Sequence, residues 1–217
     1  MLTNKVDYLF QSGTDVYWPH LDLAASLHSA YAQRHGMEYL CYRGPFLASP
    51  WLVNEKLQAT FDASWKQWSM MLELVRDKNT GWVFCVDADA IIFGDEDPRP
   101  VMEDYLVGMV WYPKNRLHIG HYHRGTFFLR ACEQVAELLE HVLEDGPGKH
   151  PFYSQGILNG YITKPQWKGK LKRLPLKWNS CVKHNDPKKC VIRAWHGLGN
   201  IHKRFLMMQA EMRRRGR

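Results

Sequence analysis

The chain has 217 residues, enough for one well-filled hydrophobic core and short for two. Its composition, with 45% hydrophobic and 24% charged residues, is that of an ordinary globular protein and excludes a low-complexity or disordered chain. No stretch of about 18 consecutive apolar residues is present, which excludes a conventional membrane-spanning helix.

Charge is distributed unevenly along the chain. Residues 164–217 contain 16 lysines and arginines against 2 acidic residues, a net charge of +14, whereas residues 1–163 contain 13 against 20, a net charge of −7. The two values sum to the net charge of +7 of the whole chain. The basic segment 164–217 predicts a polyanionic partner: a nucleotide diphosphate, a nucleic acid, or both. A solvated basic surface that only aids solubility is the alternative.

Hydrophobic periodicity predicts alternating strands and helices in the first part of the chain. A strand over 6–10, a polar loop over 12–15, a helix from Pro19 to about Gly36 and a strand over 37–42 form a β-α-β unit. A second helix is expected from about residue 63 to 78. The continuous apolar run 82–86 is typical of a strand buried on both faces.

The remaining elements extend this pattern. Strands are expected over 107–112 and 126–130, followed by an amphipathic helix that contains Val135 and Val142 and is closed by Gly146. Short helices from residue 151, a strand near 171–174 and basic loops complete the chain. Alternating strands and helices indicate an α/β fold with a mostly parallel sheet, in a single domain spanning residues 1–217.

Asp87 and Asp89 follow directly after the apolar run 82–86. Ligands of parallel sheets gather at the carboxyl ends of the strands, and two carboxylates two positions apart point the same way when the backbone is extended. Such oxygen ligands suit Mg²⁺ or Mn²⁺, which neutralise a leaving diphosphate. The alternative is a pair of solvated aspartates, because a D-x-D motif alone is a weak signal.

The same motif occurs in a second class of enzyme. Haloacid-dehalogenase-like phosphatases also present D-x-D after an apolar strand, with one aspartate as the nucleophile. In those proteins the motif usually lies near the N-terminus and is followed by Thr or Val, whereas here some 80 residues precede it and Ala90 follows. The position of the motif therefore favours the metal site.

Cysteine usage bears on the compartment. The five cysteines are an odd number, widely scattered and without a C-x-x-C pair. Reduced thiols fit this pattern better than a disulfide framework does. A cytoplasmic location is therefore expected, which for a phage-encoded protein is the cytoplasm of the host.

Several segments together resemble one known family. They are, in chain order, 31–36 (YAQRHG), 65–66 (WK), 83–93 (VFCVDADAIIF), 124–130 (RGTFFLR), 154–160 (SQGILNG), 174–179 (LPLKWN) and 196–203 (HGLGNIHK). With these motifs the chain resembles the GT-A-fold retaining glycosyltransferases, which include bacterial lipopolysaccharide galactosyltransferases and eukaryotic α-galactosyl-, α-mannosyl- and xylosyltransferases. Each motif is short, but seven in the same order are far more specific than any one.

The resemblance implies a metal-dependent transfer from a nucleotide-sugar donor, by analogy a UDP-hexose, with retention at the anomeric carbon. It makes His196 the third ligand, with Asp87 and Asp89, of a Mn²⁺ or Mg²⁺ ion. Asp87 also reaches the ribose, and Asp89 binds the diphosphate as well as the metal. Gln155 corresponds to the position on the reacting face of the sugar, where an amide stabilises an oxocarbenium-like centre.

The resemblance also implies the remainder of the donor site. Lys203, or His202 in its place, binds the diphosphate. The other implied donor-binding residues are Lys66, Arg124, Gly125 and Gly199.

The chain departs from the family pattern at three places. Ser154 and Gly156 replace the acids that flank the family's Gln, and His123 replaces the Asn of its N-x-G motif. The phosphate-binding Lys lies one position late. These departures bear on the sugar that is used more than on the type of reaction.

Two acceptors and one non-enzymatic role remain open from the sequence. The basic segment 164–217 can dock along a phosphate backbone, so hydroxymethylated bases in DNA, glucosylated as in phages after base flipping, are one candidate acceptor. A saccharide or lipid-linked glycan, with the basic segment touching an anionic membrane, is the other. A basic nucleic-acid-binding module on a non-catalytic transferase scaffold is the third reading, supported by the lost acids at positions 154 and 156.

Overall fold

A computed structural model of the chain describes residues 5–44, 55–113, 121–145, 153–181, 189–196, 198 and 200–217; for 55–64 and 153 it describes the backbone only. The helices and strands of these residues are β1 (Val6–Gly13), η1 (Asp15–Tyr17), α1 (Trp18–Arg34), β2 (Met37–Arg43), α2 (Glu55–Arg76), β3 (Thr80–Val86), β4 (Ala90–Ile92), α3 (Arg99–Met102), β5 (Val107–Tyr112), β6 (His121–Arg130), α4 (Glu133–Glu144), α5 (Tyr153–Ile162), η2 (Pro165–Trp167), β7 (Leu171–Leu174), η3 (Leu176–Asn179), β8 (Ser180–Cys181), β9 (Ile192–Ala194) and α6 (Ile201–Arg214).

The described strands form two sheets. Six strands make the central sheet in the order β2-β1-β3-β6-β5-β7, and three short strands make a second sheet in the order β4-β9-β8. In the central sheet β1 pairs in parallel with β2 and β3, and β5 pairs in parallel with β7, whereas β6 runs antiparallel to both β3 and β5. The expected α/β fold with a mostly parallel sheet is confirmed.

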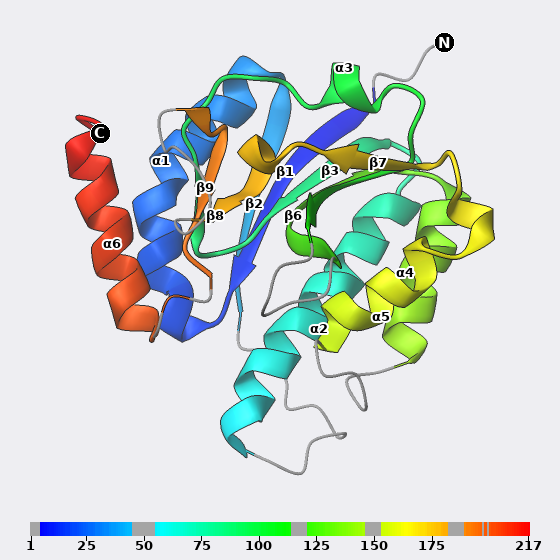
Figure 1. Cartoon of the computed structure of the whole chain (residues 1–217), viewed down its shortest axis with the longest axis horizontal. Helices are drawn as coiled ribbons and strands as arrows, with labels where there is room; N and C mark the ends of the chain where they lie inside the picture. The colour runs from blue at the N-terminus through cyan, green and yellow to red at the C-terminus, as the bar shows by residue number, and fades with distance from the viewer. Residues whose placement is uncertain are drawn as a thin grey trace.

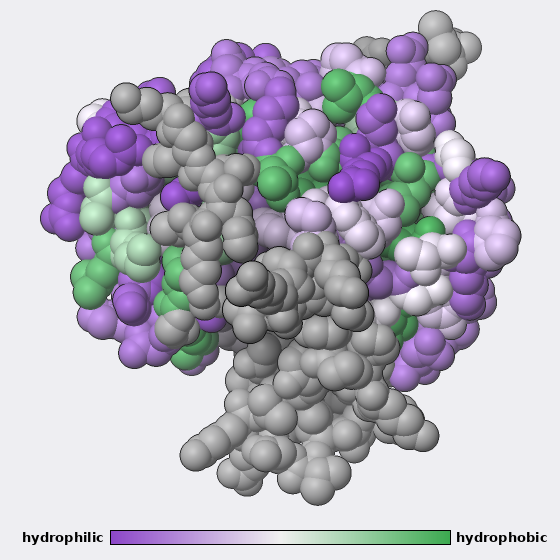
Figure 2. Space-filling view, viewed as in Figure 1, coloured by the Kyte–Doolittle hydropathy of each residue, from purple (hydrophilic) through white to green (hydrophobic). Residues whose placement is uncertain are grey.

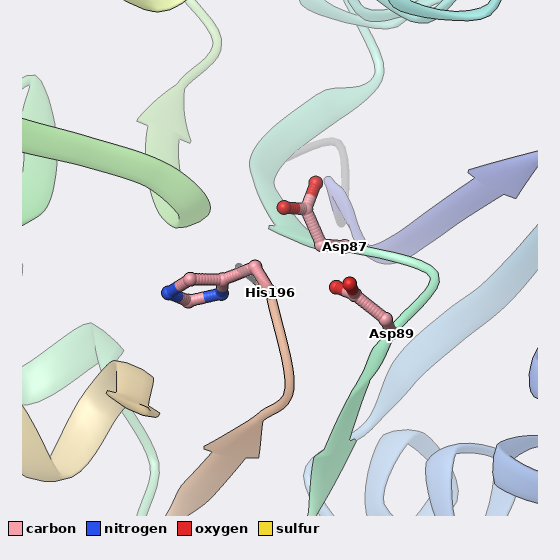
Figure 3. A group of neighbouring side chains, drawn as sticks. All are labelled: Asp87, Asp89 and His196. Carbon is pink, nitrogen blue, oxygen red and sulfur yellow. The ribbon is translucent and has the colours of Figure 1, made fainter. Parts of the chain in front are cut away.

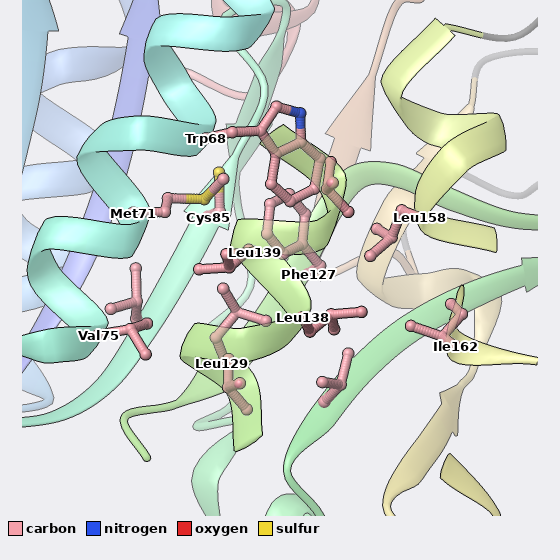
Figure 4. Close-up of a cluster of buried hydrophobic side chains, with 14 of the residues drawn as sticks. Trp68, Met71, Val75, Cys85, Phe127, Leu129, Leu138, Leu139, Leu158 and Ile162 are labelled. Atoms are coloured by element: carbon pink, nitrogen blue, oxygen red, sulfur yellow. The ribbon is translucent and has the colours of Figure 1, made fainter. Parts of the chain in front are cut away.

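Helices cover both faces of the central sheet (Figure 1). On one face α2, α4 and α5 bury a core around Trp68, whose ring stacks on Phe127 of β6 at 5.5 Å between centroids. Figure 4 shows this core, with Met71 and Leu139 reaching into it from α2 and α4. The apolar stripe predicted for α4 is therefore the one that packs on the sheet.

On the other face lie α1 and the small sheet, with α6 outside them (Figure 1). Ala24 of α1, Ile91 of β4 and Met208 of α6 are fully buried in one cluster. Trp195, just after β9, joins the same cluster. This layer fixes α6, which forms most of the last part of the basic segment 164–217, beside the D-x-D segment that follows β3.

Several predicted boundaries were wrong, although the elements were right. Helix α2 begins at Glu55 and ends at Arg76, because the residues before 63 are also good helix formers. Strand β1 continues to Gly13, where a loop was expected, because its pairing with β2 continues to Arg43. Strand β6 begins at His121 and so includes Arg124 and Gly125. The expected closure at Gly146 lies outside the described residues.

A buried polar network joins α1 to the strands beneath it. The Ile92 N–H donates to Nε2 of His28 at 3.0 Å, so the proton of the imidazole lies on Nδ1, which donates to Oε1 of Gln11 at 3.0 Å. The Tyr39 hydroxyl donates to the same oxygen at 2.9 Å. Nε2 of Gln11 in turn donates to the backbone oxygen of Asp87 at 2.9 Å. The network thus holds the D-x-D segment from the side of α1.

All five cysteines are free thiols. This agrees with the reading of the cysteine pattern as reduced. Among the described helices, none combines the length and the apolar character needed to cross a membrane.

The environment of His28 predicts a pH-dependent stability. Burial lowers the pKa of His28 from 6.5 to about 3, because the side chain is fully enclosed. Below pH 6.5 His28 binds a proton in the unfolded chain, whereas in the folded chain it stays neutral until the pH approaches 3. The contribution of neutral His28 to stability is therefore intact above pH 6.5 and lost as the pH falls toward 3. Between pH 7 and 5 the parent chain should lose about 2 kcal/mol of unfolding free energy through this residue.

His28→Gln tests this prediction, because glutamine keeps a polar side chain that does not titrate. The stability difference between parent and variant, measured by urea unfolding, should shrink by about 2 kcal/mol from pH 7 to 5. His141→Gln, which changes an exposed histidine on α4, is the matched control. A difference for His28→Gln that stays constant over this range would contradict the prediction.

Candidate metal and donor site

The D-x-D segment forms a turn at the carboxyl end of β3. The Asp87 N–H donates to the backbone oxygen of Gly125 on β6 at 2.9 Å, and the Ala90 N–H closes the turn on the Asp87 oxygen at 3.1 Å. The backbone here is a turn and not the extended segment expected from the sequence, and the two carboxylates lie close together across this turn. Gly13 lies beside this turn, and a Cβ there would reach ordinary contact with Cβ of Ala88 at 3.4 Å but would clash with Cβ of Tyr17 at 2.9 Å.

The small sheet brings His196 to this turn. Strands β4 and β9 pair antiparallel with Ala90 opposite Ala194, and the Trp195 N–H donates to the backbone oxygen of Asp89 at 3.0 Å. One residue further along, the ladder brings His196 beside the aspartates, although more than 100 residues separate them in the sequence. A three-residue strand thus accounts for the meeting of the two motifs.

Asp87, Asp89 and His196 offer one ligand atom each, and these atoms all lie within 4.8 Å of one another. Figure 3 shows the three side chains beside one another, Asp87 and Asp89 from the segment after β3 and His196 from the segment after β9. Two ligands of one Mg²⁺ or Mn²⁺ ion are at most about 4.2 Å apart, so side-chain movements below about 1 Å suffice for coordination. Two carboxylates and one imidazole are a donor set that suits Mn²⁺. The residues therefore fit a divalent ion.

The site concentrates buried charge of both signs. Burial raises the pKa of Asp87, and the neighbouring Asp89 adds to this effect, while Arg124 and His196 oppose it. Burial likewise raises the pKa of Asp89, against the opposing effect of Arg204. Two carboxylates this close and this enclosed favour a nearby cation.

Arg204 supplies one such cation, and sequence reasoning missed it. Its Nη1 donates to Oδ2 of Asp89 at 2.9 Å and to the Tyr17 hydroxyl at 3.2 Å. The Asp89 side chain is 6% exposed and that of Arg204 is 19% exposed. Arg204 follows the predicted Lys203 directly, but no motif marks it, because its role depends on how α6 packs against α1.

The predicted donor residues of β6 lie next to the aspartates. Gly125 binds the Asp87 backbone, and the Arg124 N–H donates to Oε1 of Gln155 at 3.2 Å. Gln155 lies in the first turn of α5, and Asn159 anchors that turn by donating to the Gln155 backbone oxygen at 2.7 Å. Gln155 therefore lies beside the strand that borders the candidate metal site, and its role on the reacting face of the sugar stays a prediction.

On α2 the side chain that faces this region is Gln67, a residue that sequence reasoning did not single out. It is buried, accepts from Nη1 of Arg124 at 3.4 Å and donates to Sγ of Cys85 at 3.2 Å. Lys66, the predicted residue, precedes it in the helix, and its role as a donor ligand stays a prediction.

The start of α6 holds the remaining predicted residues. Asn200 caps the helix by accepting from the Lys203 N–H at 2.8 Å, and His202 and Lys203 are exposed in its first turn. Free N–H groups and cations at a helix start form an anion-binding environment, here within one turn of Arg204. Gly199 lies outside the described residues.

Of three comparisons with known proteins, the one with solved structures finds matches. Neither family models nor curated protein sequences match the chain. Among solved structures, a glycosyltransferase involved in the glycosylation of the major capsid of PBCV-1 matches with a TM-score of 0.69 at 13% identity, over 94% of this chain and 99% of that one.

Two further solved structures are similar. The galactosyltransferase LgtC, in complex with donor and acceptor sugar analogues, matches with a TM-score of 0.59 at 13% identity, over 95% of this chain and 96% of that one. The bifunctional glycosyltransferase WbbM matches with a TM-score of 0.63 at 13% identity, over 97% of this chain and 50% of that one. The chain therefore has the α/β fold of GT-A glycosyltransferases, as its motifs predicted.

Proposed function

We propose that the chain is a metal-dependent glycosyltransferase that moves a hexose from a UDP-linked donor to an acceptor hydroxyl. The observation that carries the proposal is the convergence of Asp87, Asp89 and His196 at the carboxyl end of β3. The likeness of the fold to that of three glycosyltransferases supports it.

The proposed reaction exchanges one bond at the anomeric carbon. The bond to the diphosphate oxygen breaks, a bond to the acceptor oxygen forms on the same face of the sugar, and the acceptor hydroxyl gives its proton to the departing diphosphate or to solvent. When bound, the divalent ion neutralises the departing diphosphate as a Lewis acid. Arg204 and Lys203 add positive charge at the same end of the site, and His202 lies exposed beside Lys203.

Gln155 is the proposed residue on the reacting face. An amide is a poor nucleophile, so its role is to stabilise the positive charge that develops at the anomeric carbon. Its contact with the Arg124 N–H keeps the side chain beside β6. Ser154, which stands where the family has an acid, is fully buried.

For the acceptor, we propose a hydroxymethylated base in DNA, and a saccharide or lipid-linked glycan is the competing candidate. Helix α6 supports DNA: it starts at the metal site and carries the exposed Arg213 and Arg214 at its far end. Its 14 residues span about 21 Å, so the charges can follow several phosphates of a backbone. Figure 2 shows mainly hydrophilic residues, around a small apolar group, on the α6 side of the molecule. On this proposal the protein acts in the cytoplasm.

A panel of nucleotide sugars tests the donor. With Mn²⁺ present, the correct donor at 100 times its Kd should stabilise the folded chain by about 2.7 kcal/mol, a rise in Tm of about 5 to 10 °C. The same mixtures, scored for hydrolysis of the donor, distinguish an enzyme from a non-catalytic scaffold. Asp89→Ala should abolish the rise, whereas Asp95→Ala, at an exposed carboxylate, should keep it. A rise that persists with Asp89→Ala or with a chelator would contradict the metal site.

Arg204→Ala tests the charge balance around Asp89. Removing the partner of a buried carboxylate should lower the unfolding free energy by about 3 kcal/mol in metal-free protein. Mn²⁺ should restore part of this loss, because it replaces the missing positive charge. Urea unfolding with chelator and with Mn²⁺ measures both values. Arg34→Ala, whose partner Asp95 is exposed, is the control and should change stability by less than about 1 kcal/mol in either condition. Equal losses for Arg204→Ala with and without Mn²⁺ would count against the proposal.

The acceptor is tested by transfer to DNA containing 5-hydroxymethylcytosine and, in parallel, to oligosaccharides. Binding of the DNA should weaken with salt, and replacing Arg213 and Arg217 by alanine should reduce the slope of log affinity against log salt by about two. Arg76→Ala, at an exposed arginine paired with Glu140, is the control. Transfer to oligosaccharides alone would assign the glycan acceptor instead.

A further inference from the structure

His123 lies directly against the imidazole of His196. The two rings are 4.0 Å apart between centroids and inclined by only 22°, which makes this a stack. His123 comes from β6 and His196 from the segment after β9, so the stack joins the central sheet to the small sheet. The ring of His123 makes this contact. In the family that the chain resembles, an asparagine occupies this position.

The hydrogen bonds of His123 define its tautomer. Nδ1 accepts from the Gly125 N–H at 2.9 Å, and Nδ2 of Asn179 approaches the same nitrogen at 2.9 Å. A nitrogen that accepts a backbone N–H carries no proton, so the proton lies on Nε2 and the ring is neutral. A neutral ring can stack on a metal-binding imidazole without adding a repulsive charge.

Asn179 is oriented by His123 rather than by other partners. Its side chain is fully buried, and its Oδ1 has no hydrogen-bond partner among the described residues. The opposite amide orientation would place that oxygen against the Nδ1 lone pair of His123. Because Nδ2 of Asn179 contacts His123 while its buried Oδ1 stays without a partner among the described residues, the contact with His123 sets the orientation of the Asn179 amide.

Gly125 connects this arrangement to the aspartates. A Cβ at Gly125 would lie 2.9 Å from both Cε1 and Nδ1 of His123 and 3.1 Å from Nδ2 of Asn179. Its backbone oxygen accepts from the Asp87 N–H at 2.9 Å. Because Gly125 has no side chain, the His123 ring can lie directly against it. The backbone oxygen of the same residue binds the D-x-D turn.

We propose that His123 is a positioning residue, which holds the His196 imidazole in the plane needed to bind the divalent ion. The inference rests on the proposed metal site. An imidazole coordinates through a lone pair in its own plane, so rotation about the Cβ–Cγ bond moves the nitrogen away from the ion. A fixed neighbouring ring restricts that rotation, as supporting groups do at other metal sites.

Mn²⁺ affinity of the purified chain, measured from the EPR signal of free Mn²⁺, tests the proposal without any substrate. His123→Asn, which removes the ring, should weaken Mn²⁺ binding by about tenfold or more. His123→Phe keeps a stacking ring but loses the hydrogen bonds to Nδ1, so it should weaken Mn²⁺ binding less than His123→Asn does. His141→Asn, at an exposed histidine on α4, is the control and should leave the affinity unchanged.

Urea unfolding of each variant separates a loss of folding from a loss of affinity. If a His123 variant fails to fold, Asn179→Ala takes its place, and the freed ring should weaken Mn²⁺ binding by about threefold. If His123→Asn folds and binds Mn²⁺ as tightly as the parent does, the inference about His123 is wrong and the metal site is unaffected. A parent chain that does not bind Mn²⁺ would overturn the metal site and the inference together.

Discussion

The short antiparallel ladder between β4 and β9 is the constraint on which the rest of the site depends. It sets Ala90 opposite Ala194, and the Trp195 N–H extends it to the backbone oxygen of Asp89. Because register fixes which residues are neighbours, His196 can reach the aspartates only in this pairing. The burial of Ile91 and Trp195 between α1 and α6 is what holds the ladder in place. On the proposed function, the hydrophobic packing of α6 is therefore a condition for binding the metal ion.

The site is also a balance of enclosed charges. Asp87 and Asp89 lie where burial opposes their ionisation, and Arg124 and Arg204 offset that cost from β6 and α6. Enclosed carboxylates of this kind favour added positive charge, and on the proposed function the cations around them suit the diphosphate of the donor. Uncharged side chains also lie around the aspartates. His28 and His123 each accept a backbone N–H, from Ile92 and Gly125, and so stay uncharged close to the aspartates.

The sequence predicts the parts of this structure that depend on local patterns. Apolar runs located β1 and β3, and the D-x-D and HGLGNIHK motifs located the three candidate metal ligands. Strands β4, β8 and β9 were not predicted, because segments of two or three residues carry no periodicity. Gln11, Gln67 and Arg204 were missed because ordinary polar residues gain a role only when distant elements pack around them. His123 was noted as a departure from the family, but its stack on His196 depends on two strands meeting.

Anomalous diffraction from crystals containing Mn²⁺ and UDP measures the central claim most directly. The account predicts one strong peak at about 2.0 to 2.3 Å from a carboxylate oxygen of Asp87, one of Asp89 and a ring nitrogen of His196, with the diphosphate completing the coordination. A Mn²⁺ ion bound elsewhere on the chain, or UDP bound with these three side chains uncoordinated, would contradict it.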